Sequence, residues 1–277
     1  MFTFTSTDGL EIHVHEWPAP GEPRGIVQLS HGMGEHAARY AHLAGTLNGL
    51  GYTVYADDHR GHGRTMQGKP GHLGEDGWNL LVADMVALTR LVRDRHPGLP
   101  VVLLGHSLGS FAAQQYILDH ADLLDGVAMT GTTALDGLFG ALAEAGGDVL
   151  AAFNAPFQPA RTPADWLSRD EAQVDAYVAD PWCGFELDDQ GMGDLINATA
   201  RLVDPAAVPK DLPLYVAVGD RDPLNGGLAL SDLLVQRYRD AGLTDVTYRT
   251  YAGARHEILN ETNRDEVEAD LAAWLTR

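Results

Sequence analysis

The sequence predicts an α/β fold in which helices cover both faces of a mostly parallel sheet. Short apolar runs bounded by glycine or proline recur along the chain, and such runs are typical of strands buried on both faces of a parallel sheet. Helical stretches alternate with these runs, as βαβ units require. The predicted strands are 25–29, 52–56, 101–104, 126–129, 214–218 and 246–251, and the predicted helices are 39–50, 78–95, 107–119, 228–241 and about 264–275.

The first 17 residues have a different pattern. Apolar and polar side chains alternate over 2–5, and a second alternating stretch covers 12–16, on either side of an Asp8-Gly9 turn. Period-2 alternation around such a turn favours an antiparallel hairpin with one face exposed. We therefore expect this N-terminal hairpin at one edge of the sheet.

The alternation of strand and helix stops between residues 134 and 209. This segment is first rich in Ala, Gly and Leu, then rich in turn residues, and then helical from a capping-box pattern at Ser168-Arg169-Asp170-Glu171. We interpret 134–209 as a helical cap insertion that divides the core into residues 1–133 and 210–277. The alternative is that the segment packs as extra helices and takes no part in substrate binding.

Composition excludes several classes of function. The 277 residues include 39 acids and 19 bases, a formal charge of −20, whereas binding to a phosphate backbone depends on Lys and Arg. The single cysteine, Cys183, cannot form an intrachain disulfide or a cysteine-based zinc site. The longest apolar stretch, 138–153, is interrupted by Glu144 and Asp148, and the opening residues lack the basic start of a secretory signal. We expect a soluble, cytoplasmic protein with no nucleic-acid partner and no integral membrane segment.

The pentapeptide Gly105-His106-Ser107-Leu108-Gly109 directly follows one predicted strand and directly precedes a helix. This is the context of a nucleophile elbow, a sharp strand-to-helix turn that exposes the serine hydroxyl at the end of the strand. Ser107 is therefore the predicted nucleophile.

A serine nucleophile needs a base, which in turn needs a carboxylate to orient it. His256 follows the last predicted strand, at the carboxyl edge of the sheet. Asp220 and Asp222 follow the preceding strand, and we prefer Asp222 because it lies deeper in the loop and precedes a proline. The predicted triad is Ser107, Asp222 and His256.

The oxyanion of an acyl-transfer reaction needs two preorganised N–H donors. The N–H of Leu108 opens the helix after the elbow, and the N–H of Met33 lies between two glycines in the loop after strand 25–29. Glu35 and Glu261 are predicted to support loops rather than to act as acid catalysts. Five histidines offer the alternative of a metal site, but we favour hydrogen bonds to loop backbone and predict no metal or other cofactor; they are His31, His36, His59, His62 and His106.

Together these motifs resemble the monoacylglycerol lipase and lysophospholipase-like group of α/β-hydrolases, over nearly the whole chain. The resemblance implies the α/β-hydrolase fold, the triad and oxyanion donors named above, and hydrolysis of a carboxylic ester through an acyl-enzyme. The matching pieces are HGMGEH with Arg39-Tyr40, DHRGHGR at 58–64, GHSLG at 105–109, GDRD at 219–222, HEILNE at 256–261, and SRD with DAY and DP in the cap. The stretch 137–157 does not match the group.

The cap carries more apolar residues than the outer face of a small insertion would hold. If these residues are buried against a ligand, they would form a binding site for an acyl chain. A protein with a formal charge of −20 favours uncharged single-chain esters such as monoacylglycerols over anionic lipids. We expect transient contact with lipid aggregates at most. The predicted substrate-binding residues are Leu138, Phe139, Leu142, Phe153 and Phe157, in an apolar set that also includes Val149 and Leu150.

Other functions remain open from the sequence. The same triad would serve a lysophospholipase, a short-chain esterase, a thioesterase or an aminopeptidase. An aminopeptidase would need carboxylates in the cap to bind a free amine, and four are available: Glu186, Asp188, Asp189 and Asp194. A ligand-binding receptor that kept the fold and lost catalysis is the non-enzymatic alternative.

Overall fold

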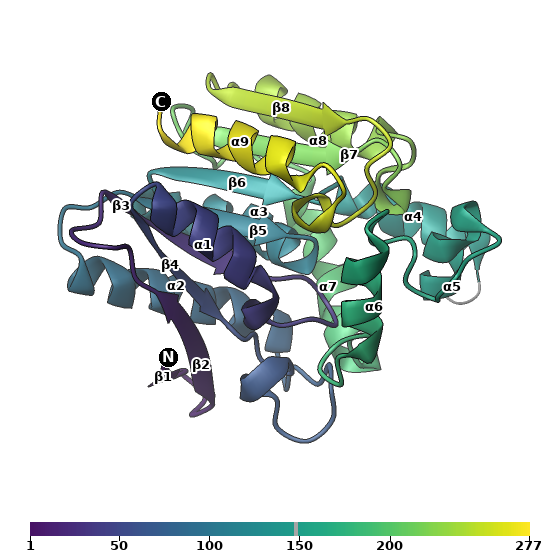
Figure 1. Ribbon diagram of the computed structural model, residues 1–277, viewed down its shortest axis with the longest axis horizontal. Helices are drawn as coiled ribbons and strands as arrows, with labels where there is room; N and C mark the ends of the chain where they lie inside the picture. The colour runs from purple at the N-terminus through teal and green to yellow at the C-terminus, as the bar shows by residue number, and fades with distance from the viewer. Residues whose placement is uncertain (147–148) are drawn as a thin grey trace.

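A computed structural model of the protein describes residues 1–146 and 149–277 (Figure 1). Asp148, which interrupts the apolar stretch 138–153, lies outside the described residues, and the side chain of Val149 is likewise not described. No helix of the described part is long and apolar enough to cross a membrane.

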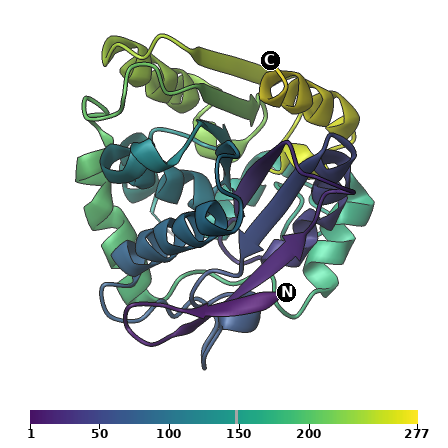
Figure 2. The same ribbon diagram turned by 90° about the vertical axis from the view of Figure 1, so that its left-hand side faces the viewer.

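One twisted sheet runs through the molecule, with helices on both sides (Figure 2). The strand order is β1-β2-β4-β3-β5-β6-β7-β8, in which the β1–β2 and β2–β4 pairs are antiparallel and the other pairs parallel. The predicted mostly parallel sheet with an N-terminal antiparallel hairpin is confirmed. The strands are β1 Phe2–Thr5, β2 Glu11–Trp17, β3 Gly25–Ser30, β4 Tyr52–Asp57, β5 Val101–His106, β6 Gly126–Thr130, β7 Leu214–Gly219 and β8 Val246–Tyr251.

Two helical layers bury the sheet. Helices α1 (Ala41–Gly49) and α9 (Arg264–Leu275) cover one face, while α2 (Gly77–Arg95), α3 (Leu108–His120) and α8 (Ala229–Asp240) cover the other (Figures 1 and 2). Consecutive residues of β3 supply both cores, with Ile26 on the α2 and α3 side and Val27 on the α1 and α9 side. Burial on both faces explains why the central strands read as unbroken apolar runs.

Four more helices lie between β6 and β7 in the chain, beyond the carboxyl ends of these strands (Figure 1). They are α4 Leu135–Ala145, α5 Val149–Asn154, α6 Glu171–Ala179 and α7 Asp189–Leu202. The predicted start of α6 is corrected by two residues. The N-cap is Asp170, whose carboxylate accepts from the Ala172 N–H at 3.0 Å, and not Ser168. Ser168 instead donates its hydroxyl to the carbonyl of Asn260 at 2.8 Å.

Short 3₁₀ turns complete the described structure. They occur at Ala37–Tyr40, Gly63–Thr65, Ala121–Leu123, Ala155–Phe157, Pro223–Asn225 and Ile258–Asn260.

The turn from β5 into α3 packs directly on the end of β3. A Cβ atom at Gly109 would lie 2.1 Å from the carbonyl oxygen of Ser30, and one at Gly105 would lie 2.5 Å from the carbonyl oxygen of Gly109. Both positions therefore exclude any side chain. This close approach brings the first turn of α3 against the loop that follows β3.

Gly109→Ala should destabilise the protein by about 1–3 kcal/mol, because the added methyl forces the backbone of α3 away from Ser30. Gly45→Ala is the matched control, since Gly45 lies in α1 with open space around its Cα, and alanine there should stabilise by up to about 1 kcal/mol. Urea unfolding measures both changes. A Gly109→Ala variant as stable as the wild type would contradict the described packing of α3 on β3.

Candidate active site

Ser107 stands at the turn between β5 and α3 with an unusual backbone. Its φ is 50° and its ψ is −118°, and a positive φ is strained for a residue with a side chain. The Ser107 N–H donates to the Thr130 carbonyl at 3.0 Å, which holds the strained turn against β6. Ser107 lines a mainly apolar cavity, as we expect of the predicted nucleophile at an elbow.

His256 and Asp222 form a buried pair at the ends of β8 and β7. The imidazole Nδ1 lies 2.9 Å from Asp222 Oδ2, and the other carboxylate oxygen accepts from the Leu224 N–H at 2.9 Å. Asp220 does not take part, because its carboxylate accepts from the Gly253 N–H at 2.7 Å. With Nδ1 engaged, Nε2 is the nitrogen that can accept a proton. Burial lowers the pKa of His256, but the Asp222 carboxylate outweighs burial and raises it.

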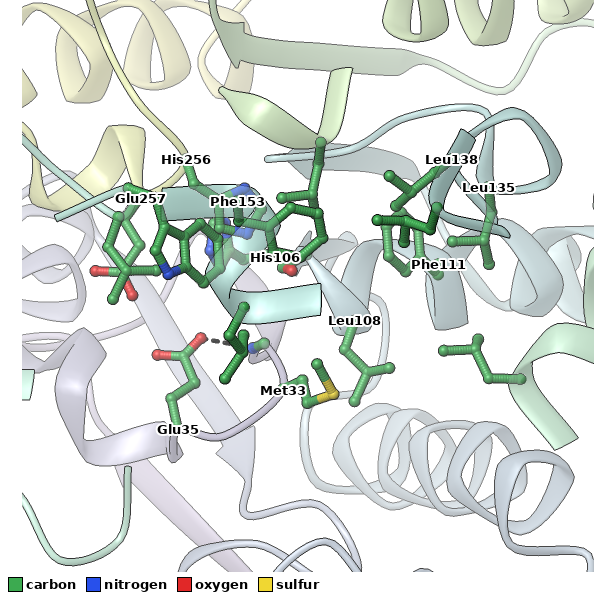
Figure 3. Close-up of a pocket in the computed structure, with 18 of the residues that line it drawn as sticks. Met33, Glu35, His106, Leu108, Phe111, Leu135, Leu138, Phe153, His256 and Glu257 are labelled. Atoms are coloured by element: carbon green, nitrogen blue, oxygen red, sulfur yellow. Dashed lines mark hydrogen bonds between the residues drawn. The ribbon is translucent and has the colours of Figure 1, made fainter. Parts of the chain in front are cut away.

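The loop after β3 carries the second predicted oxyanion donor. The Gly32 N–H donates to the Glu35 carboxylate at 2.6 Å, which fixes the backbone immediately before Met33 (Figure 3). Gly34 has a φ of 64° and lies against the cap, where a Cβ atom would be 2.3 Å from the Phe185 carbonyl oxygen. Met33 lines the same cavity as Leu108, whose N–H belongs to the first turn of α3 and has no carbonyl partner within the helix.

Arg39 joins this loop to the loop that carries His256. Its guanidinium donates to Glu35 at 2.5 Å and to both oxygens of Glu257 at 2.6 and 2.8 Å. The Tyr40 hydroxyl donates to Glu35 at 2.7 Å. Burial alone would raise the pKa of Glu257, but the charge and hydrogen bonds of Arg39 outweigh it and lower the pKa to about 2. Glu35 therefore acts on loop backbone, as a supporting carboxylate does.

A mainly apolar cavity, partly open to solvent, contains Ser107 and His256 in its wall. Of the predicted substrate-binding residues, Leu138, Phe139, Leu142 and Phe153 line it. Phe157 does not, because its half-buried ring lies under the Arg255 guanidinium, 4.3 Å away. Leu150 from the wider apolar set also lines the cavity.

Several lining residues escaped prediction because no local pattern separates a cavity-facing side chain from a core-facing one. For two of them, Met192 and Leu195, the sequence did offer a signal, because apolar residues spaced three apart lie on one face of α7. The residues not predicted are Phe111, Leu135, Trp166, Leu167, Tyr177, Phe185, Met192, Leu195 and Leu224.

The buried histidines are hydrogen-bonded to the protein. His59 lies 2.7 Å from Asp57 and 3.0 Å from the Ser30 hydroxyl, and His62 bonds the Arg60 carbonyl at 3.0 Å. His31 bonds the Gly32 carbonyl at 2.7 Å through Nδ1 and accepts from the His59 N–H through Nε2. His106 Nδ1 lies 3.0 Å from the Thr130 hydroxyl. These hydrogen bonds stabilise the loops beneath the cavity.

Among the described residues, one group brings three metal-ligand atoms within 4.8 Å of one another, namely His36, Asp180 and Cys183. His36 Nε2 already pairs with Asp180 at 2.9 Å, which links the loop after β3 to the cap. Burial raises the pKa of the Cys183 thiol, so sulfur is protonated and is a weak ligand at neutral pH.

The acidic residues that an aminopeptidase would need lie elsewhere. The cavity lining contains none of Glu186, Asp188, Asp189 and Asp194. Asp188 instead caps α7 by accepting from the Gly191 N–H at 2.9 Å and pairs with His72 at 2.5 Å.

Fold and site together define a serine hydrolase of the α/β-hydrolase class. The chain belongs to the family described as serine aminopeptidase, S33 (Hydrolase_4), which it matches over residues 21–263. It is 33% identical to a monoacylglycerol lipase of Mycolicibacterium smegmatis, with 99% of this chain and 95% of the relative covered. It is 30% identical to the human monoglyceride lipase, with 98% and 89% covered. The predicted resemblance to the monoacylglycerol lipase group, and the enzyme class it implied, are confirmed.

A solved structure supports the same conclusion. The highly thermostable carboxyl esterase from Bacillus coagulans, in complex with glycerol, superposes with a TM-score of 0.84 at 30% identity. The alignment covers 99% of this chain and 97% of the esterase.

Arg39→Met should remove the only charge that both Glu35 and Glu257 contact through hydrogen bonds in the described structure. Losing one partner of a buried ion pair typically costs about 3–5 kcal/mol. Without Arg39 the pKa of the buried Glu257 in the folded state should rise above its unfolded value, so the variant should be least stable at pH 8 and partly recover at pH 5, where this carboxylate protonates. Wild-type Glu257, with its lowered pKa, should not show this loss of stability with rising pH.

Guanidinium chloride unfolding at both pH values measures the effect. Arg201→Met is the matched control, because Arg201 pairs with Asp119 at the surface and such pairs contribute about 0–1 kcal/mol. The account of the buried ion pair is wrong if Arg39→Met and Arg201→Met lose the same stability at pH 8.

Proposed function

We propose that the protein hydrolyses carboxylic esters through an acyl-enzyme on Ser107, and that its substrates are monoacylglycerols or similar uncharged single-chain esters. One observation carries the proposal. In the cavity that contains Ser107 and His256, the apolar side chains of Phe111, Leu135 and Leu138 lie on one side and the carboxylates of Glu35 and Glu257 on the other (Figure 3). An ester with a long acyl chain and a small polar alcohol has the same division.

The proposed mechanism uses the groups in the positions described. Ser107 attacks the ester carbonyl, and His256 Nε2 takes the hydroxyl proton and passes it to the leaving alcohol. Asp222 holds Nδ1–H at 2.9 Å and stabilises the imidazolium. The N–H groups of Met33 and Leu108 bind the oxyanion. Water then attacks the acyl-enzyme with His256 acting as base, which releases the fatty acid and restores Ser107.

The acyl chain is assigned to the apolar end, formed largely by the cap that we propose for residues 134–209. Phe111, Leu135 and Leu138 lie on the far side of the cavity from Glu35 and Glu257 (Figure 3). Glu35 and Glu257 at the other end share one cation, Arg39, so this group keeps a net negative charge, and a neutral alcohol fits there better than a phosphate. The glycerol bound to the related Bacillus coagulans esterase, and the monoacylglycerol lipases among the relatives, support a glycerol ester.

The family description raises the alternative of an aminopeptidase, which needs an unpaired carboxylate for the substrate ammonium. Glu35 and Glu257 are the acids in the described cavity lining, and Arg39 pairs with both. The ester hydrolase is therefore favoured.

Asp222→Asn should lower kcat by about 10⁴, because the amide cannot stabilise the imidazolium and favours the wrong tautomer. Asp220→Asn, in the same loop, should lower kcat less than about tenfold, since Asp220 bonds only loop backbone in the described contacts. Initial rates with nitrophenyl butyrate give both values. The carboxylate is misassigned if the order of the two effects is reversed.

Specificity should rise with acyl length until the cavity is full. Each buried methylene contributes up to about 0.8 kcal/mol, roughly a fourfold gain in kcat/KM. The measurement is kcat/KM for monoacylglycerols from two to sixteen carbons, with lysophosphatidylglycerol as the anionic comparison, which should be at least about tenfold poorer. Leu138→Phe should shorten the preferred chain, whereas Phe157→Ala, outside the cavity, should leave it unchanged. A steady decline from the two-carbon ester onward would identify a short-chain esterase instead.

A further inference from the structure

The imidazole of His256 packs against two aromatic rings. One is His106, from the end of β5, with ring centroids 4.9 Å apart and planes inclined by 51°. The other is Trp166, from the cap, at 5.0 Å and 36°. Trp166 is itself held, since it is 9% exposed and packs against Phe153 at 5.2 Å. Figure 3 shows His256, His106 and Phe153 gathered at this point of the cavity.

The loop that carries His256 is also built onto the cap through its backbone. The Glu257 N–H donates to the Leu167 carbonyl at 2.7 Å, and the His256 N–H donates to the Trp166 carbonyl at 3.4 Å. Arg255 donates through its guanidinium to the carbonyls of Asp165 and Ser168. The segment 165–168 therefore lies along the loop after β8, and these contacts hold Trp166 beside the imidazole of His256.

Buried Glu261 strengthens this junction from the other end of the loop. Its carboxylate accepts from the Arg169 N–H at 3.1 Å, from Arg169 Nε at 2.9 Å and from the Arg255 N–H at 2.9 Å. A carboxylate that satisfies donors of both segments stops them from sliding past each other.

A general base needs more than one hydrogen bond to stay in place. The contact with Asp222 fixes Nδ1, but the ring can still pivot about its bond to Cβ and turn Nε2 away from Ser107. The packing of the His106 and Trp166 rings against the imidazole restricts this freedom. Misplacement of a reacting group by about 1 Å can cost on the order of 10²-fold in rate.

The two flanking rings also suit the charge that His256 acquires. Burial, followed by the proximity of His256, lowers the pKa of His106 to about 3, so this neighbour is neutral and does not repel an imidazolium. The indole face of Trp166 attracts a cation. A neutral His106 and the indole of Trp166 are thus compatible with the protonated base that forms during acyl transfer.

We propose that Trp166 is a positioning residue for catalysis, through which the cap holds His256 in line with Ser107. This inference rests on the proposed serine mechanism. It gives the cap a part in the chemistry in addition to substrate binding, and it makes the activity of the base depend on the contact between segment 165–168 and the loop after β8.

The test compares Trp166→Ala, Trp166→Phe and Trp182→Ala in the full-length protein. Trp182 is the matched control, because it is also a cap tryptophan packed against a histidine, His36 at 5.5 Å, but does not line the cavity. The main measurement is the rate of inactivation by diisopropyl fluorophosphate. This reagent is too small to use the acyl site, so its reaction reports the serine and its base. Values of kcat and KM with nitrophenyl butyrate and nitrophenyl decanoate, and thermal unfolding, accompany it.

Trp166→Ala should lose about 10–100-fold in kcat for both esters and in the inactivation rate. Trp166→Phe, which restores a flat face, should recover most of that loss, and Trp182→Ala should match the wild type. The inference is overturned if Trp166→Ala raises KM for the decanoate alone and keeps the wild-type inactivation rate, or if Trp166→Phe is as slow as Trp166→Ala while both remain folded. A wild-type protein that neither hydrolyses the esters nor reacts with the fluorophosphate would instead refute the proposed function.

Discussion

The structure depends on one buried cation that two carboxylates share. The Arg39 side chain is 10% exposed. Its ion pairs with Glu35 and Glu257 compensate for the hydration that the guanidinium loses on burial. Glu35 in turn holds the Gly32 N–H beside the predicted oxyanion donor, and Glu257 follows the predicted base in the chain. The geometry of an acyl-transfer site requires these two loops to keep a constant separation. A bidentate guanidinium supplies that constraint because its donors are planar and fixed.

The segment that we propose as a cap, residues 134–209, completes the cavity at the carboxyl ends of the strands. The carboxyl ends of parallel strands bring Ser107, Asp222 and His256 to one edge, yet the apolar walls of the cavity come mostly from α4 to α7. The same cap touches the core through polar contacts at His36–Asp180 and Arg169–Glu261. An insertion attached by such directional bonds positions its apolar residues more accurately than an apolar contact alone would, because hydrogen bonds specify distance and angle.

The parts that the sequence predicted are those encoded locally. Unbroken apolar runs identified the central strands, and the elbow glycines identified the turn whose close approach to β3 the structure describes. We preferred Asp222 to Asp220 because Asp222 lies deeper in the loop, and in the structure Asp222 is the residue that pairs with His256. Phe157 and Trp166 were beyond local reasoning. Both are aromatic residues of the proposed cap. Trp166 faces the cavity and Phe157 faces Arg255, and this difference depends on the long-range pairing of segment 165–168 with the loop after β8.

The central claim is that Ser107, activated by His256, forms the covalent intermediate. The most direct measurement is stoichiometric labelling with a fluorophosphonate, followed by mass spectrometry of the digested protein. The account predicts one adduct per chain, on the peptide containing Ser107, with ester hydrolysis lost in proportion to labelling and no adduct in Ser107→Ala. Hydrolysis that persists after full labelling, or an adduct on another residue, would contradict it.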